Sequence, residues 1–187
     1  MPRLRQERRR NPRRPRPRQN LDALYLKSVL KPIAPIILTV RWLDENKHYE
    51  FLEHTADAYV AAYGRNLAEA FENAAVAMFD VMTEVKTVNF RFEDSVTVEG
   101  EDEYSLLYSW LEALLIKCET NGMLYSKFEI LEIAKTVGGL KLEARIWGEK
   151  FNPKKHLQKV GVKAVTYHRM EILKEPERVT LKFILDI

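Results

Sequence analysis

The feature that most constrains the fold is a change of apolar spacing along the second part of the chain. Apolar side chains recur at helical spacing in two stretches, from Leu67 to about Met82 and from Leu107 to Cys118. The segments around them alternate apolar and polar residues, as half-buried strands do. Two helices embedded among mostly hairpin-connected strands predict an α+β domain. We expect an antiparallel or mixed β-sheet covered on one side by the two amphipathic helices.

Local signals predict where these elements begin and end. Asn66 followed by Glu69 is a helix-start signature, and Asn121-Gly122 should end the second helix. Gly138-Gly139 is a natural hairpin turn. The expected strands cover residues 56–63, 128–134, 140–147, 160–173 and 179–187, with two short strands at 88–92 and 96–98 that are broken near Asp94.

The first 45 residues differ in composition from the rest of the chain. Residues 1–20 hold nine arginines and one acid, which gives a charge of +8, whereas the remainder has 21 basic and 26 acidic residues. Repulsion between arginines and the stiffness of the prolines disfavour packing of this arm. The sequence therefore predicts a basic, disordered extension over residues 1–45 and one folded domain over residues 46–187. The arm either contacts RNA phosphates or is an extension without a role.

The chain is expected to work in the cytoplasm, without a membrane segment. Its single cysteine, Cys118, continues the apolar stripe of the second helix and suggests core packing rather than a disulfide or a nucleophile. The apolar stretch 29–43 is broken by two prolines, a lysine and an arginine, and is too short to span a bilayer.

Three short stretches carry more polar residues than a sheet needs. The first, residues 53–57, places His54 and Asp57 at the start of a strand, where they suit a cation site, a general base or a surface turn. The second runs through the basic loop to 168 and includes Lys155 and Lys163, which suit phosphate contacts or an ordinary solvated loop. The third is Asp186-Ile187, where a carboxylate next to the chain end suits Ca²⁺, Mg²⁺ or Mn²⁺ better than zinc.

In this order and spacing, these stretches resemble the archease family from about Tyr49 to Ile187. The segments that carry the resemblance are LEHTADAYVAAYG, LAEAFENAAVAMFDVM, EDEYSLLYSWLEALL, GEKFNPKKH, VKAVTYH and the closing LDI.

The resemblance implies a small cytosolic protein that assists an RtcB-type tRNA-splicing RNA ligase. Such a helper promotes guanylylation and multiple turnover of the ligase, is not itself an enzyme, and meets tRNA through the ligase. It implies a divalent cation, with calcium expected and Mg²⁺ or Mn²⁺ as alternatives, held by Asp57, Asp186 and main-chain or terminal oxygens of Ile187. It also implies a needed lysine, for which Lys155 and Lys163 are both candidates, with His54 as a further candidate for ligase activation.

Two other classes of function stay open at this point. One is a metal-dependent phosphoesterase in which Asp57 and Asp186 hold the metal and His54 is the base. The other is a general chaperone or RNA-binding module whose working part is the arginine-rich arm.

Overall fold

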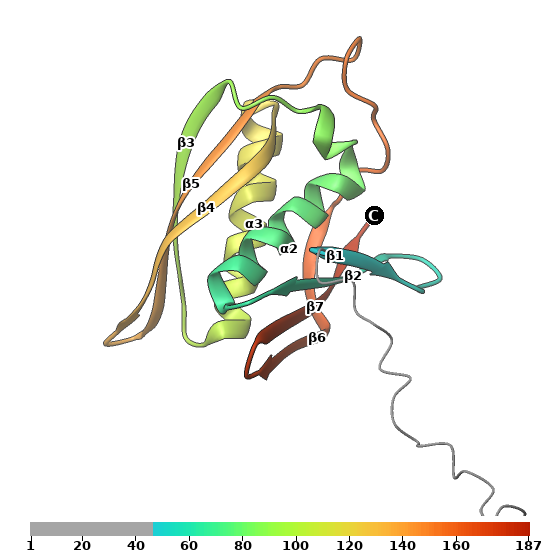
Figure 1. Cartoon of the computed structure of the whole chain (residues 1–187). Coiled ribbons are helices and arrows are strands. Elements are labelled where there is room, and N and C mark those ends of the chain that lie inside the picture. The colour runs from blue at the N-terminus through green and yellow to red at the C-terminus, as the bar shows by residue number, and fades with distance from the viewer. Residues whose placement is uncertain (1–46) are drawn as a thin grey trace, which may run out of the picture. The chain divides into compact units, whose positions relative to one another are not determined.

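The computed structural model describes residues 47–187, so the predictions for the extension of residues 1–45 and for its RNA contacts lie outside the described residues. Two α-helices, seven strands and one short 3₁₀ helix make up the described part (Figure 1). In chain order these are β1 Tyr49–Leu52, β2 Ala58–Gly64, α2 Leu67–Met82, η1 Val85–Thr87, β3 Phe92–Gly100, α3 Glu103–Asn121, β4 Met123–Thr136, β5 Gly139–Lys150, β6 Ala164–Glu175 and β7 Arg178–Asp186.

The strands form two antiparallel sheets instead of one. A four-stranded sheet has the order β1-β2-β7-β6, and a three-stranded sheet has the order β3-β5-β4. The two helices pack between these sheets, as Figure 1 shows, with α2 contacting β2 and β4 while α3 contacts β3 and β6. The α+β class and the antiparallel alternative are confirmed, but the expectation of a single sheet covered on one side was wrong.

The amino-acid pattern of α2 explains why it can lie between two sheets. Its residues Ala70, Ala74, Ala75 and Ala77 are fully buried together with larger neighbours such as Phe79. A helix that is apolar around most of its circumference belongs in the interior. The small alanine side chains let the backbone of α2 approach both sheets closely.

Trp110 joins the helices to the three-stranded sheet. The indole is fully buried, and its Nε1–H donates a hydrogen bond of 3.0 Å to the carbonyl oxygen of Phe71 in α2. The ring of Phe128 in β4 meets the indole edge to face, with centroids 6.2 Å apart. Because a buried indole N–H needs a partner, this bond fixes how α3 lies against α2.

The start of α2 and the end of α3 lie where their local signals predict them. The side chain of Asn66 accepts the N–H of Glu69 at 2.9 Å, and Asp102 and Ser105 form a reciprocal capping box at the start of α3. Gly122 adopts the left-handed conformation with φ of 60° and ends α3.

Strand boundaries differ from the predictions where side-chain contacts override the apolar alternation. Asp94 does not break a strand, because Lys117 of α3 donates to its carboxylate at 2.7 Å, so β3 runs on through it. Residues 88–91 lie outside β3, since the N–H of Val88 bonds to Val85 at the end of η1. β1 was not predicted, β4 begins earlier than expected, and β6 begins at Ala164 rather than at residue 160.

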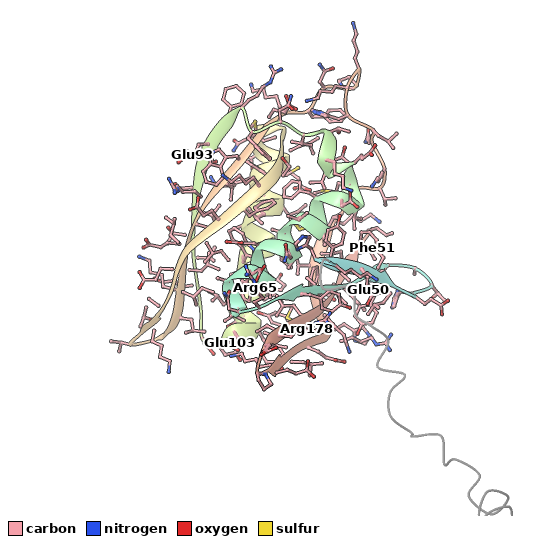
Figure 2. The ribbon with its side chains drawn as sticks, in the orientation of Figure 1. Glu50, Phe51, Arg65, Glu93, Glu103 and Arg178 are labelled. Carbon is pink, nitrogen blue, oxygen red and sulfur yellow. The ribbon has the colours of Figure 1, made fainter. Side chains whose placement is uncertain are left out.

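The outer face of the three-stranded sheet is polar. Arg145 bonds to Glu129 at 3.1 Å, Lys141 pairs with Glu143 at 2.6 Å, and Trp147 donates from Nε1 to Glu93, which Figure 2 labels on β3. The Arg145 and Trp147 contacts cross to neighbouring strands, while Lys141 and Glu143 pair along β5, and such pairing is typical of a sheet face turned to solvent.

Two further predictions concern Cys118 and the membrane. The Cys118 side chain is partly buried against the core, and burial followed by the nearby Glu119 raises its thiol pKa to about 11, so the thiolate is disfavoured. No helix within residues 47–187 is both long and apolar enough to cross a membrane.

Candidate functional site

The register of the four-stranded sheet brings two distant aspartates together at one end. Ala58 of β2 lies opposite Leu185 of β7, and this is the last register pair of the two strands. Asp57 is the residue just before β2, and Asp186 directly follows Leu185. The fold therefore brings Asp57 and Asp186 to the same end of the sheet, although 128 residues separate them in the sequence.

Lys163 lies on the other side of β7 at the same end of the sheet. Its main-chain N–H donates to the carbonyl oxygen of Asp186 at 2.8 Å, and its Nζ donates to the main-chain oxygen of Ile187 at 2.8 Å. The first register pair of β6 with β7 is Ala164 with Asp186. The last residues of the chain are thus flanked by the start of β2 on one side and Lys163 on the other, and Figure 1 shows the C-terminus near the start of β2.

His54 shapes the turn that leads to Asp57. Its Nδ1 accepts the main-chain N–H of Asp57 at 3.1 Å, and the same nitrogen lies 3.6 Å from the Asp57 carboxylate. Because Nδ1 acts as an acceptor, it carries no proton in this arrangement, and the proton of the neutral ring lies on Nε2. The imidazole also packs edge to face on Tyr59, with centroids 6.3 Å apart. His54 therefore positions Asp57.

The chemistry of the donor atoms fits a hard cation. The carboxylates of Asp57 and Asp186 and the main-chain oxygen of Ile187 lie at this end of the sheet, and calcium and magnesium prefer oxygen ligands of these kinds. The Asp57 side chain is about 30% exposed, which leaves it accessible to an ion from solvent. Within residues 47–187 no three or more His, Cys, Asp or Glu side chains gather as a metal-binding group. The predicted ligand set accordingly draws its third member from the main chain of Ile187.

Lys155, the other predicted lysine, belongs to a different cluster. Its Nζ donates to the carboxylate of Glu149, which is 6% exposed at the end of β5. The same carboxylate accepts the N–H of Asn89 at 2.7 Å and lies 3.2 Å from Arg91 Nε. Nε2 of the buried His156 lies 3.2 Å from it as well. Lys155 therefore has a structural partner, whereas Lys163 contacts the chain end.

The proton position and charge of this cluster follow from its hydrogen bonds. His156 Nδ1 accepts the N–H of Asn152 at 3.0 Å, so the ring proton lies on Nε2 and points to Glu149. Burial alone would raise the pKa of Glu149, but hydrogen bonds from Lys155, Asn89 and His156 lower it to about 2. Glu149 is thus a buried anion that holds the loop after β5 in place.

Sequence reasoning missed the burial of Glu149 and His156. Both were read as parts of a basic loop, because charged side chains are seldom fully buried unless they are paired. The available signal was the placement of a single acid, Glu149, at the start of a segment that is otherwise rich in lysine.

The fold defines the class of this protein as an α+β domain in which two helices are enclosed between two antiparallel sheets. Residues 49–187 match the model of the Archease protein family, and the chain belongs to that family.

Individual relatives agree with this membership. The protein archease of Sulfurisphaera tokodaii is 48% identical over 139 residues, which cover 74% of this chain and 98% of the relative. The protein archease of Pyrococcus abyssi is 47% identical over 131 residues, which cover 70% of this chain and 92% of the relative.

Solved structures show the same fold. The solution structure of protein 1598 from Methanobacterium thermoautotrophicum is 44% identical, has a TM-score of 0.67, and is matched over 99% of its length and 75% of this chain. An archease from Thermotoga maritima, described as a possible chaperone, has a TM-score of 0.50 at 15% identity and is matched over 96% of its length and 74% of this chain. This last likeness concerns the fold alone.

Proposed function

We propose that this protein is an accessory factor that activates an RtcB-type RNA ligase in tRNA splicing. It promotes guanylylation of the ligase and lets the ligase turn over many times, and it catalyses no reaction of its own. It works in the cytoplasm and meets tRNA through the ligase. Membership of the archease family supports this proposal.

The observation that supports the proposal is that Asp57, Asp186 and Ile187 all lie at one end of the four-stranded sheet, next to the Ala58–Leu185 register pair. Two adjacent carboxylates repel each other unless a cation or a proton neutralises them. A divalent ion, with calcium expected, would be held by these two side chains and the main-chain oxygen of Ile187. When bound, such an ion supplies a positive centre with open coordination positions for an oxygen of the partner.

The residues around this site have separate positioning roles. His54 holds the turn in which Asp57 lies, because its Nδ1 accepts the Asp57 N–H. Lys163 holds the end of β7 through its two hydrogen bonds, and its ammonium group keeps a positive charge beside the carboxylates. We infer that Lys163, rather than Lys155, is the lysine that ligase activation needs.

Guanylylation of the purified ligase, followed with labelled GTP, tests this function at the site. The full-length protein should accelerate labelling, whereas Asp186→Ala or removal of Asp186 and Ile187 should abolish the acceleration and leave the thermal unfolding transition cooperative. Glu132→Ala, which removes an exposed carboxylate from β4, is the matched control and should act like the parent. Unchanged acceleration by Asp186→Ala would refute the site.

The competing hydrolase is tested in the same preparation. Without ligase, the protein should leave RNA and nucleotides intact in the presence of Ca²⁺, Mg²⁺ or Mn²⁺. Hydrolysis that Asp57→Asn and Asp186→Asn both remove would establish a phosphoesterase instead.

A further inference from the structure

The loop between β5 and β6 is long, basic and held in place at many points. Residues 151–163 contain no helix or strand. With Lys150 at its start, the stretch of residues 150–163 holds five lysines and no acidic residue. Residues 47–187 as a whole carry more acidic than basic residues. Loops of this length without regular structure are uncommon in compact domains and usually serve a function.

Hydrogen bonds anchor this loop at both ends and in the middle. The N–H of Phe151 bonds to Gly122 at 2.9 Å, and His156 bonds to the buried Glu149. Further along, Thr83 at the end of α2 donates from its hydroxyl to the carbonyl oxygen of Leu157 at 2.8 Å, and the N–H of Lys159 bonds to Met82 at 2.9 Å. The loop therefore presents its surface in a preorganised shape, which lowers the entropy lost when a partner binds.

This anchored loop borders a shallow hollow of about 430 Å³ that is largely open to solvent. We call it the loop hollow, and it is lined by Phe151, Pro153, Lys154, Lys155, His156, Leu157 and Gln158. Two of its apolar side chains are exposed, Phe151 by 39% and Leu157 by 59%. Such side chains, held in solvent by an ordered backbone, are typical of a binding surface.

The charges of the hollow indicate what kind of group it receives. The ammonium group of Lys155 is already paired with Glu149, whereas that of Lys154 has no ion pair or hydrogen bond within residues 47–187; only the main-chain N–H of Lys154 bonds, to Asn152. An ammonium group next to exposed apolar side chains complements a carboxylate next to an apolar side chain. Phe151, Pro153 and Leu157 give no contact suited to a phosphate, so the hollow fits a protein segment better than a nucleic-acid strand.

We propose that the loop hollow docks an acidic segment of the partner ligase, which inserts an aliphatic or aromatic side chain between Phe151 and Leu157 and places a carboxylate near Lys154. The inference rests on the proposed function, because the ligase is the partner that supplies this segment. It assigns binding to the loop hollow and activation to the Asp57–Asp186 end of the four-stranded sheet.

Binding of the full-length protein to purified ligase, measured by biolayer interferometry, tests this assignment. The double variant Leu157→Ser/Lys154→Glu should weaken the Kd at least tenfold, and its stimulation of ligation should return at high concentration. The matched control is Leu131→Ser/Lys135→Glu on β4, which changes an exposed leucine and a lysine in the same way and should stay within twofold of the parent. A cooperative thermal transition at the parent temperature shows that each variant is folded.

The other outcomes distinguish this inference from the proposed function. Asp186→Ala should lose activation of the ligase completely and lose much less affinity for it than Leu157→Ser/Lys154→Glu does, so weak binding and failed activation are separate defects. If Leu157→Ser/Lys154→Glu binds the ligase with the same Kd as the parent, the docking proposal is overturned and the proposed function still stands. The same holds if this variant loses affinity only for tRNA, because the hollow would then bind phosphates. A parent protein that neither binds nor stimulates the ligase would overturn both.

Discussion

Lys163 bonds to Ile187 through its side chain, with 2.8 Å between Nζ and the main-chain oxygen, while its N–H bonds to the adjacent Asp186. This double contact ties the segment before β6 to the end of β7. Chain ends commonly fray, but here the last residues are fixed between the start of β2 and the start of β6. The position of Asp186 is therefore set by the sheet.

The first prediction concerns cation binding by the two aspartates. Millimolar Ca²⁺ should raise the Tm of the full-length protein, because an ion that binds only the folded state stabilises it. Asp57→Asn and Asp186→Asn should each remove most of this rise, and in the absence of divalent ions they should match or exceed the parent Tm, since the repulsion is relieved. Scanning calorimetry with and without Ca²⁺ measures both effects, and an undiminished rise in both variants would exclude these ligands.

The second prediction separates the two lysines. Lys163→Ala should reduce ligase stimulation at least tenfold with little loss of stability, because its side chain is exposed. Lys155→Ala should instead lower the free energy of unfolding by about 1–3 kcal/mol, since the buried Glu149 loses a charged partner. Urea titration measures the stability of each variant, and guanylylation rates measure its stimulation of the ligase. Loss of stimulation in Lys155→Ala together with full stimulation by Lys163→Ala would show that Lys155 is the functional lysine.

The third prediction follows from the pKa of Glu149, which is lowered from 4.5 to about 2. A depressed carboxylate pKa gives stability that is fully present above the unfolded value near pH 4.5. That stability is lost as the pH falls toward 2. One pKa unit corresponds to about 1.4 kcal/mol, and screening by solvent around Lys155 and Arg91 reduces the total to about 2 kcal/mol.

Glu149→Gln tests this pH dependence directly. The variant should be less stable than the parent at pH 7, and the difference should shrink as the pH falls from 4.5 to 2. Chemical denaturation at a series of pH values provides the comparison. A difference that stays constant over this range would mean that Glu149 does not titrate in the way the cluster implies.

The fourth prediction tests the close approach of β2 to α2. A Cβ added at Gly64 would lie 2.3 Å from the main-chain nitrogen of Ala70, in the first turn of the helix. Because backbone cannot yield as a flexible side chain does, Gly64→Ala should cost about 3 kcal/mol or more of stability. Gly138→Ala, where no atom lies within 4 Å, is the control and should change stability by far less in a thermal melt.

The helices could be predicted from the sequence because their determinants are local. The apolar spacing of α2 and the cap formed by Asn66 lie within a few residues of each other. The division into two sheets could not be predicted, since alternation shows that β5 has a buried face but does not show that its partners are β3 and β4. That β3 is one continuous strand could not be predicted either, because it depends on a hydrogen bond from Lys117, which is distant in sequence, to the carboxylate of Asp94.

The candidate site stays a prediction. The family resemblance pointed to Asp57 and Asp186, and the register of β2 with β7 gives the physical reason why both lie at the same end of the sheet. The choice between Lys155 and Lys163 needed tertiary contacts, because both lie in the same lysine-rich stretch of sequence. The buried cluster around Glu149 was missed, because nothing in a single sequence shows that an acid is enclosed by Lys155, Arg91 and His156.

The most direct test of the central claim is ligation of tRNA halves supplied in large excess over the purified RtcB-type ligase. With the full-length protein present, each ligase molecule should produce many joined tRNAs. Without it, or with Asp186→Ala in its place, product should stop near one per ligase molecule. Equal amounts of product per ligase with and without the protein would contradict the account.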